Sequence, residues 1–397
     1  MIREPSARRD RIAISLVFAV HGTVTGTYAS RLPWIAAHVH ATPGTLGAAL
    51  IAPTAGALLT MPFAGGLAHR LGARAALRLL LALWTLSLVL PGVMPNIGML
   101  AVGLFVYGAT AGMADVLMNG QAVRIEARAG KSIMSGLHGM WSVGGIVGGF
   151  FGAACAGAGI SASREFLVTA ALLTVIGLCA AWMLPADAVF TGDGEQIRPP
   201  RFALPTKAVL GIGIVGFCAV FAEGSGTDWS AVYLTDVTHA SAAVGAYCVT
   251  GFAATMALGR LTGDQIVRRL GPVWTVRIGG VLAVLGAITI AVARTPWLGI
   301  VGFAAMGLGI ATGVPLAIAA AGRRGQNSET AVAGVATITY TAGLLAGPSI
   351  GALGSAVSLA FSFGFVAVLA GGMLLSAHTL GIAKGDRMAP EPAESAA

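Results

Sequence analysis

Five ionisable side chains lie deep inside long apolar runs of this 397-residue sequence: His21, Asp115, His138, Glu223 and Asp228. A charge at the centre of a lipid bilayer costs at least about 2.5–3.5 kcal/mol on insertion scales, so such residues normally face a bundle interior or a water-filled path. Carboxyl and imidazole groups in those surroundings can bind and release protons. The pattern predicts proton binding inside a membrane, and the sequence shows no nucleophile–base pair or Walker motif that would indicate an enzyme.

Asp115 is the strongest candidate for a proton carrier. Asn119 follows it by one helical turn, so the two side chains share a helix face. A carboxyl group removed from water can be neutral at physiological pH, and a proton carrier needs that property. The alternative is a static hydrogen bond between helices. Glu223 is the second proton-coupling candidate, or an acceptor for a substrate hydroxyl group.

Substrate-binding candidates are polar or aromatic residues within the same apolar runs. His138 lies at a depth that matches Asp115, so we expect the two to meet. Trp141 offers a flat apolar face and an N–H donor, with helix packing as the alternative. For Asp228 and Trp229 the alternative is an outer helix cap beside an interfacial tryptophan. The full set of candidates is His21, Asn119, His138, Trp141, Asp228, Trp229 and Tyr340.

The composition requires a membrane. Hydrophobic residues make up 56% of the chain and charged residues only 10%, and the mean hydropathy is +0.82. A soluble domain carries about 25% charged residues, so a soluble enzyme is excluded, and the apolar surface is too abundant for a disordered chain. The four cysteines lie in four different runs without metal-ligand spacing, so neither a disulfide nor a metal site is expected.

Twelve apolar runs are each long enough for a transmembrane helix. They cover residues 12–35, 44–64, 75–93, 97–123, 133–157, 165–184, 207–232, 240–259, 273–292, 296–320, 330–353 and 356–380. Each run is continuously apolar, which is typical of membrane helices and not of barrel strands. The first run continues past Tyr28 without a cleavage site, which favours an uncleaved span over a signal peptide.

The basic residues set the orientation. With twelve spans, 21 of the 24 Lys and Arg residues fall on the side that carries both termini, and the other side holds Arg31, Arg164 and Arg294. Because basic loops stay in the cytoplasm, both termini are expected there. The net charge of +8 therefore reports topology, and no nucleic-acid partner is expected. We interpret Arg31 as an outer-end residue of the first span, with binding of a substrate anion as the alternative.

The sequence divides into two halves. Residues 186–206 are polar and contain Pro199, Pro200 and Pro205, which predicts a cytoplasmic linker between six-helix bundles at 1–185 and 207–383. Residues 384–397 are polar and predict a disordered cytoplasmic tail. The pairs Leu71–Gly72 and Leu270–Gly271 end two short basic turns and lie 199 residues apart. Two parallel repeats of this kind are typical of transporters built from two rocking bundles.

These turns carry a family resemblance. The first reads GGLAHRLGAR and resembles the cytoplasmic signature of the major facilitator superfamily, with His69 in place of the usual acid; the second keeps an acid, Asp264. The resemblance implies the twelve-helix, all-α membrane fold of that family. It also implies a cytoplasmic gate formed by Gly65, Arg70, Gly72, Arg74, Gly259, Arg260 and Asp264.

The fourth apolar run narrows the resemblance. Its segment GATAGMADVLMNGQAVR, with Asp115 and Asn119, is similar to the fucose permease group of proton-coupled sugar symporters, although the first run has no acid. The resemblance implies a monomeric secondary transporter in a bacterial-type inner membrane, surrounded by lipid. It would import a small polar solute, such as a sugar or sugar acid, by proton symport, with the proton as coupling ion and without a cofactor.

Proton-coupled efflux of a drug or metabolite is the alternative. It is favoured by the segment GLLAGPSIG at Gly343–Gly351, which resembles a Gly-Pro motif of drug antiporters. A channel or a receptor is a third class, but neither a continuous polar lining nor a signalling domain is visible in the sequence.

Overall fold

The computed structural model describes residues 4–129, 133–185, 207–323 and 328–381, and these residues fold into helices. The predicted linker and tail lie outside the described residues. The first half contains α1 (Glu4–Ser30), α2 (Leu32–His38), α3 (Pro43–Ala49), α4 (Ile51–Leu71), α5 (Ala73–Ser87), α6 (Leu90–Val93), α7 (Ile97–Ala129), α8 (Met134–Gly157) and α9 (Ala162–Met183). The second contains α10 (Lys207–Asp236), α11 (Ala242–Val292), α12 (Pro296–Ile310), α13 (Gly313–Gly322), α14 (Ser328–Ala356), α15 (Leu359–Ser376) and the 3-10 turn η2 (Ala377–Leu380).

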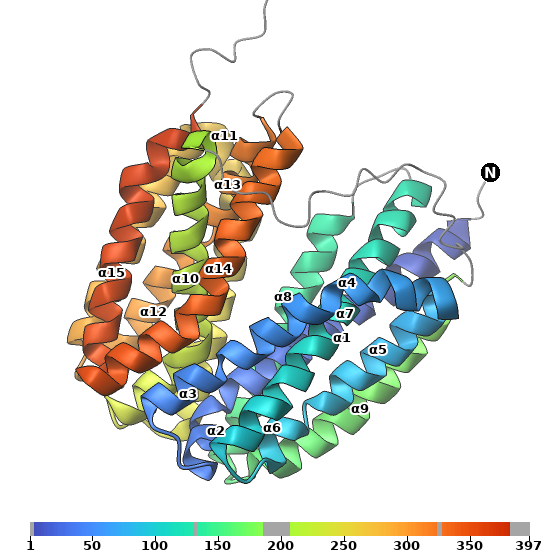
Figure 1. The fold of residues 1–397 in the computed structure, drawn as a ribbon, viewed down its shortest axis with the longest axis horizontal. Coiled ribbons are helices and arrows are strands. Elements are labelled where there is room, and N and C mark those ends of the chain that lie inside the picture. The colour runs from blue at the N-terminus through green and yellow to red at the C-terminus, as the bar shows by residue number, and fades with distance from the viewer. Residues whose placement is uncertain (1–3, 130–132, 186–206, 324–327, 382–397) are drawn as a thin grey trace, which may run out of the picture.

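The two halves form two helical bundles that diverge toward one end of the molecule (Figure 1). In the described part of the chain, eleven helical segments are long and apolar enough to cross a membrane. They match eleven of the predicted spans, and α14 lies over the remaining one at 330–353. The predicted fold class, an all-α membrane protein, is confirmed.

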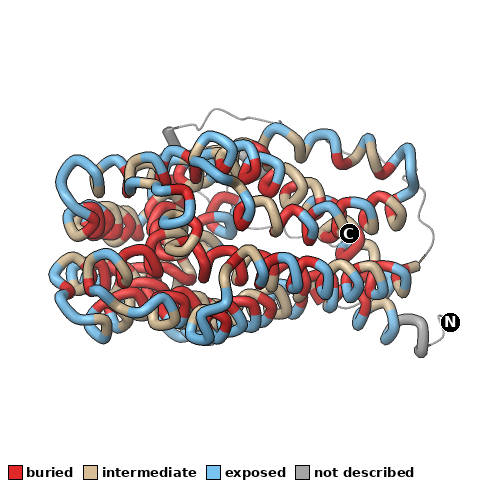
Figure 2. The backbone as a smooth tube through the Cα atoms, turned by 90° about the horizontal axis from the view of Figure 1, so that it is seen from below, coloured by how far each residue is buried: buried red, intermediate tan, exposed pale blue. Residues whose placement is uncertain are grey.

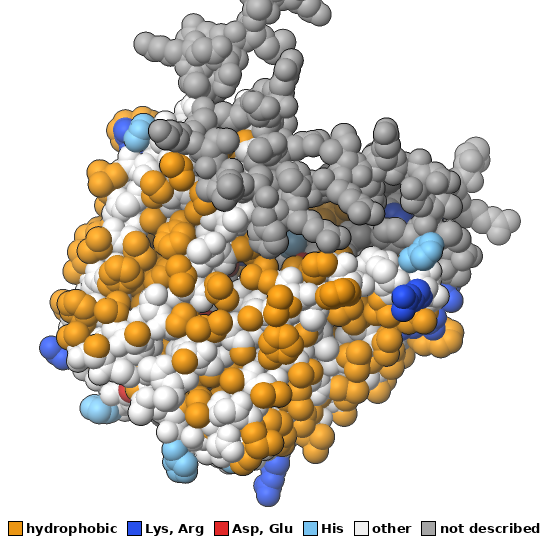
Figure 3. Space-filling model, in the orientation of Figure 1, with side chains coloured by type: hydrophobic (Ala, Val, Ile, Leu, Met, Phe, Trp, Pro, Cys, Tyr) orange, Lys and Arg blue, Asp and Glu red, His pale blue; other side chains and the backbone are white. Residues whose placement is uncertain are grey.

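The exposed surface is that of a protein surrounded by lipid. Buried residues follow the inward faces of the helices, and exposed residues follow the outside (Figure 2). Apolar side chains cover most of the described lateral face in view, with Lys and Arg at its margins (Figure 3). On α9, for example, Leu172 and Val175 expose 58% and 60% of their surface. An apolar lateral face of this kind fits a hydrocarbon environment, because large contiguous apolar patches are rare on soluble monomers.

Backbone geometry supports the predicted internal repeat. Gly72 lies between α4 and α5 with φ 82° and ψ 145°, and Gly271 interrupts α11 with φ 74° and ψ 164°. His40 and His239, also 199 residues apart, share a positive φ of 53° and 54°. The same offset relates the helix-capping residues Thr42 and Ser241. One constant offset therefore aligns the first turns of both halves.

We predict that Gly72→Ala destabilises the protein by about 1–3 kcal/mol, because its backbone conformation is essentially reserved for glycine. No neighbouring atom lies within 4 Å of the added Cβ, so the effect is purely one of the backbone. Gly65→Ala is the matched control, since Gly65 is helical and equally uncrowded. Thermal unfolding in detergent should show a lower midpoint for Gly72→Ala and an unchanged or higher one for Gly65→Ala. Equal midpoints for the two variants would contradict the prediction.

Glycines bring helices within the first bundle close together. A Cβ on Gly144 of α8 would lie 2.0 Å from the Ala19 carbonyl oxygen of α1, and one on Gly148 would lie 2.3 Å from that of Thr23. Small residues permit this approach, which matters because lipid supplies no hydrophobic drive for association. These α8 glycines are therefore helix-packing residues. The approach of α1 and α8 also fixes the side chains that these helices present to the second bundle.

The bundles touch closely at one end, where α3 meets α14. The amide of Gly44 donates a hydrogen bond to Ser355 Oγ at 2.7 Å. A Cβ on Gly47 would lie 2.8 Å from the carbonyl oxygen of Gly347. We call this contact the α3–α14 closure. The helices separate toward the opposite end, where α1 and α10 begin (Figure 1).

Candidate functional site

A cavity of about 580 Å³ lies between the two bundles. Its walls come from α1, α7 and α8 of the first bundle and from α11 of the second. The volume falls within the range of about 300–1,000 Å³ that is typical of small-molecule sites. Most of the lining is apolar, and the residues with polar or charged groups are His21, Asp115, His138, Trp141, Ser142 and Arg260. We call this space the central cavity.

A smaller pocket of about 70 Å³ adjoins the central cavity. Trp141, Ser142 and Arg260 line both spaces, so the two spaces share part of their wall. The small pocket adds Thr25 of α1 and Glu223 of α10. One liquid water occupies about 30 Å³, so the pocket has room for water or for one end of a solute.

Asp115 reaches the central cavity from the middle of α7. Asn119 Nδ2 donates hydrogen bonds to Asp115 Oδ1 at 3.1 Å and to the Asp115 carbonyl at 2.9 Å. The shared helix face expected from the sequence is therefore present. Asn119 anchors one carboxylate oxygen of Asp115, a residue that lines the central cavity.

His21 and Trp141 form the aromatic wall of the central cavity. Trp141 Nε1 donates a hydrogen bond to His21 Nδ1 at 3.1 Å. His21 Nε2 lies 3.5 Å from the carbonyl oxygen of Ala111. A ring that accepts at Nδ1 and faces a carbonyl with Nε2 is a neutral imidazole protonated at Nε2. The ring also stacks on Trp84, with centroids 5.0 Å apart, so packing holds the imidazole in place.

Glu223 and Arg260 form an ion pair that faces the cavities from the second bundle. Arg260 Nη2 donates to Glu223 Oε1 at 2.8 Å and to Oε2 at 2.9 Å. Both side chains retain about a third of their exposure. The apolar pattern predicts a span that ends at residue 259, with Arg260 just beyond it in a cytoplasmic turn. In the structure α11 continues through this position, and Arg260 lines the central cavity.

The other predicted substrate-binding residues are spread over the molecule. His138 lines the central cavity together with Asp115, and its ring meets Phe18 edge-on at 5.4 Å. Trp229 is fully buried in the second bundle. Asp228 lies next to the pocket residue Thr227 on α10. Tyr340 exposes 52% of its surface on α14, whereas the cavity walls come from α1, α7, α8, α10 and α11.

The predicted gate residues of the first half lie around the turn between α4 and α5. Gly65 and Arg70 belong to the last turns of α4, and Gly72 forms the turn itself. Arg74 donates to the carbonyl of Leu184 at 3.0 Å and so connects α5 to the end of α9.

In the second half, Gly259 packs against Ala311, because an added Cβ would lie 2.6 Å from that side chain. The side chain of Asp264 lies outside the described part of the structure.

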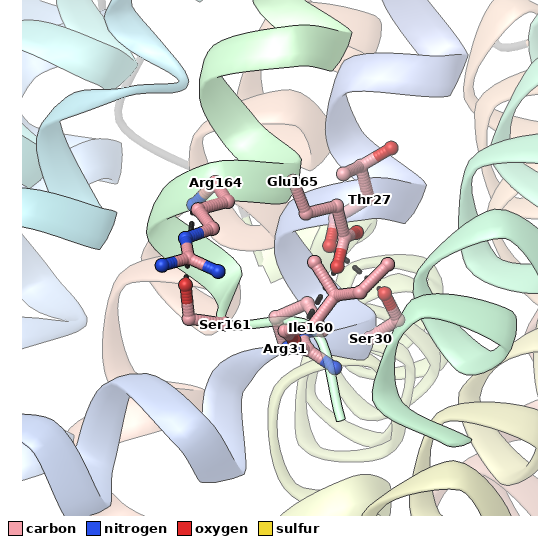
Figure 4. A network of polar contacts seen from close by, with 7 residues as sticks. All are labelled: Thr27, Ser30, Arg31, Ile160, Ser161, Arg164 and Glu165. Atoms are coloured by element: carbon pink, nitrogen blue, oxygen red, sulfur yellow. Dashed lines mark hydrogen bonds and ion pairs between the residues drawn. The ribbon is translucent and has the colours of Figure 1, made fainter. Parts of the chain in front are cut away.

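A second ion pair lies inside the first bundle, away from the cavities. Arg31 Nε lies 3.1 Å from Glu165 Oε2, and the two side chains are 3% and 0% exposed. The Arg31 guanidinium also donates to the carbonyl of Ile160. Figure 4 shows the guanidinium turned toward Glu165 at the start of α9, with Thr27 and Ser30 beside it. Glu165 is not among the predicted site residues, because its position directly after Arg164 at a span edge is typical of an ordinary interfacial residue.

Sequence comparison places the chain among transporters. The Major Facilitator Superfamily model matches residues 14–348. An MFS-type transporter of Yersinia pestis is 36% identical over 363 residues, which cover 91% of this chain and 93% of that protein. A transporter of Sinorhizobium fredii, y4wD, is 33% identical over 354 residues, which cover 89% and 93%.

Solved structures share the fold at low sequence identity. A point mutant of the nucleoside transporter NupG gives a TM-score of 0.77 at 14% identity and covers 93% of this chain and 98% of its own. An inward-facing, unoccupied bacterial homologue of the human lysosomal transporter Spinster gives 0.73 at 16%, covering 98% and 100%. FucP in its outward conformation gives 0.59 at 16%, covering 95% and 100%. The fold, the cavity between its bundles and the sequence match lead to one conclusion: this chain is a multi-pass membrane transporter, not an enzyme, and it belongs to the Major Facilitator Superfamily.

Proposed function

We propose that the protein imports a small polar solute, such as a sugar or sugar acid, by proton symport across a bacterial-type inner membrane. The observation that carries this proposal is the position of Asp115 in the wall of the central cavity, tied to Asn119 at 3.1 Å. A proton-binding group that shares a space with the solute can couple the two, because each changes the energy of binding the other. Glu223 is the second proton site, in the adjoining pocket.

Alternating access of the central cavity to the two sides of the membrane would couple the solute to the proton. If the basic end is cytoplasmic, both termini lie inside, the central cavity opens inward, and the α3–α14 closure seals the outer side. Protonated Asp115 allows the solute-loaded carrier to reorient, and ionised Asp115 allows the empty carrier to return, so each cycle carries one proton with the solute. One proton crossing 100 mV supplies about 2.3 kcal/mol. The carrier works as a monomer in lipid.

Two solved structures support the choice of a polar solute. FucP is described as a fucose:proton symporter and NupG as a nucleoside transporter, and both solutes carry several hydroxyl groups. The span-four resemblance of Asp115 and Asn119 to the fucose permease group supports the same class. The imidazole of His21 and the indole of Trp141 would contact such a solute, with Trp141 packing on the C–H face of a sugar ring.

Purified protein in liposomes that contain a pH-sensitive dye tests the proposal. A panel of sugars, sugar acids and cationic drugs is added outside, and the internal pH is followed with the uptake of each labelled compound. Internal acidification that moves with the solute would support symport. Internal alkalinisation would overturn symport and establish the alternative, proton-coupled efflux, which the Gly343–Gly351 segment in α14 favours.

We predict that a disulfide across the α3–α14 closure stops transport. A Cβ on Gly44 would lie 3.3 Å from the Cβ of Ser355, close to the spacing of about 3.5–4.5 Å in disulfides. In a background without the native cysteines, oxidation of Gly44→Cys/Ser355→Cys should block uptake, and a reductant should restore it. The single variant Gly44→Cys is the control. Full uptake by the oxidised double variant would contradict alternating access through this end.

A further inference from the structure

The two ion pairs described above differ in their access to solvent. Arg31 and Glu165 are 3% and 0% exposed inside the first bundle, whereas Arg260 and Glu223 are 34% and 31% exposed. Arg260 lines both cavities, and Glu223 lines the smaller one. A solute in the central cavity can therefore reach the second pair without any unfolding of a bundle.

The geometry of this pair leaves the arginine with further donors. Both hydrogen bonds to Glu223, at 2.8 and 2.9 Å, come from the single nitrogen Nη2. A guanidinium carries five N–H groups, and Nε and Nη1 hold three of them. Two parallel N–H groups match the two oxygens of a carboxylate, which makes arginine the preferred partner for planar anions. Both pairs of parallel N–H groups include Nη2, so a solute carboxylate gains the bidentate contact by replacing Glu223 at that nitrogen.

The surroundings of Arg260 define the rest of a matching solute. On its own helix, Ala254, Ala257 and Leu258 present an apolar face to the cavity. Trp141 lines the same two spaces from the opposite bundle. A solute that fills this space would carry one acidic group and one face of C–H or aromatic carbon.

We infer that the transported solute is a small organic acid whose carboxylate binds Arg260 in place of Glu223. This inference rests on the proposed transport function and names the solute class for its site. The displaced Glu223 carboxylate binds a proton that enters the cavity from the bulk solution, so no hydroxide ion is left in the site. The loaded site then holds an arginine cation, a solute anion and a neutral carboxyl group, so its net charge equals that of the empty ion pair. One proton accompanies one anion through this site.

Other ionisable groups face the same cavity and share in this balance. They are His21 on α1, Asp115 on α7 and His138 on α8. Among the described residues that line the two spaces, lysine is absent and Arg260 is the one arginine. Arg260 is therefore the residue that binds the anion. The carboxylate of Asp115 does not take part in anion binding and keeps its separate role as a proton site.

Ligand-induced thermal stabilisation of the full chain in detergent tests this assignment. The compounds are matched pairs of an acid and its neutral counterpart: gluconate and sorbitol, glucuronate and glucose, benzoate and benzyl alcohol. We expect at least one acid to stabilise the wild type and its neutral counterpart to have no effect. Arg260→Gln should weaken acid binding at least about 100-fold, and Arg260→Lys about tenfold, because lysine keeps the charge but not the bidentate fork.

Two further variants separate recognition from a structural role. Glu223→Gln breaks the same ion pair, but it should bind the acid as tightly as the wild type or more tightly, because the competing carboxylate is gone. Arg277→Gln is the matched control, since Arg277 lies over the Trp274 ring on the same helix, and its acid binding should be unchanged. If Arg260→Gln fails to fold, Arg260→Lys and Glu223→Gln still decide the matter.

The proposal is wrong if no acid of the panel stabilises the wild type, if neutral counterparts bind equally well, or if Arg260→Gln retains acid binding. Its failure differs from failure of proton symport. A neutral solute that acidifies liposomes equally with wild type and Arg260→Gln would overturn the anion site and leave symport intact. Acid binding that depends on Arg260, but with uptake that moves no proton, would support the anion site at Arg260 and would overturn both symport and the protonation of Glu223.

Discussion

Asp115→Asn should abolish solute-driven proton movement in liposomes, lowering coupled uptake at least about 100-fold. The amide has the shape of the protonated carboxyl group but cannot gain or lose a proton, so the variant is fixed in the carrier's neutral form. Exchange of labelled for unlabelled solute, which needs no net proton transfer, should persist. Internal dye fluorescence measures the first effect, and counterflow of labelled solute measures the second.

Two comparisons make this result specific to Asp115. Asp236 is an exposed carboxylate at the end of α10 that accepts a hydrogen bond from Thr235 at 3.1 Å. Asp236→Asn should therefore leave both assays unchanged. Asn119→Ala removes the hydrogen-bond donor to Asp115 and should weaken coupling by less than Asp115→Asn does. Unaltered proton movement in Asp115→Asn would refute the central assignment and leave Glu223 as the proton site.

The second large effect is expected from breaking the buried ion pair of the first bundle. Glu165→Gln or Arg31→Met should each lower the free energy of unfolding by about 3–5 kcal/mol, because each leaves one charge buried without its partner. The Arg31–Glu165 pair, 3.1 Å apart, lies almost entirely out of solvent. Thermal unfolding in detergent, with titration by a denaturing detergent, measures the loss.

The double variant Arg31→Met/Glu165→Met supplies the discriminating result. Apolar replacement of both partners of a buried pair is often neutral or stabilising, so this variant should recover most of the stability that either single change removes. Arg164→Gln, an exposed neighbour on α9, is the matched control and should have little effect. Additive losses in the double variant would show that the two residues do not act as a pair.

The sequence alone determined the membrane class, the positions of the spans and the repeat offset. These properties are local, because a continuous apolar run of about 20 residues fixes a membrane helix, and glycine marks the backbone turn at Gly72 and Gly271. The depth of Asp115 in its span followed from counting residues along a helix, and so did its shared face with Asn119. The family followed from motifs in the turns.

Tertiary structure alone decided which side chains face the cavity. Trp141 Nε1 on α8 donates a hydrogen bond to His21 Nδ1 on α1 at 3.1 Å. Arg260 points inward and pairs with Glu223, whereas Tyr340 is exposed. Sequence could not separate these cases, since lipid is as apolar as a bundle interior, and hydrophobicity does not mark the inward face of a membrane helix. Only the packing of α1, α7, α8, α10 and α11 against one another sets which polar groups share the space between the bundles.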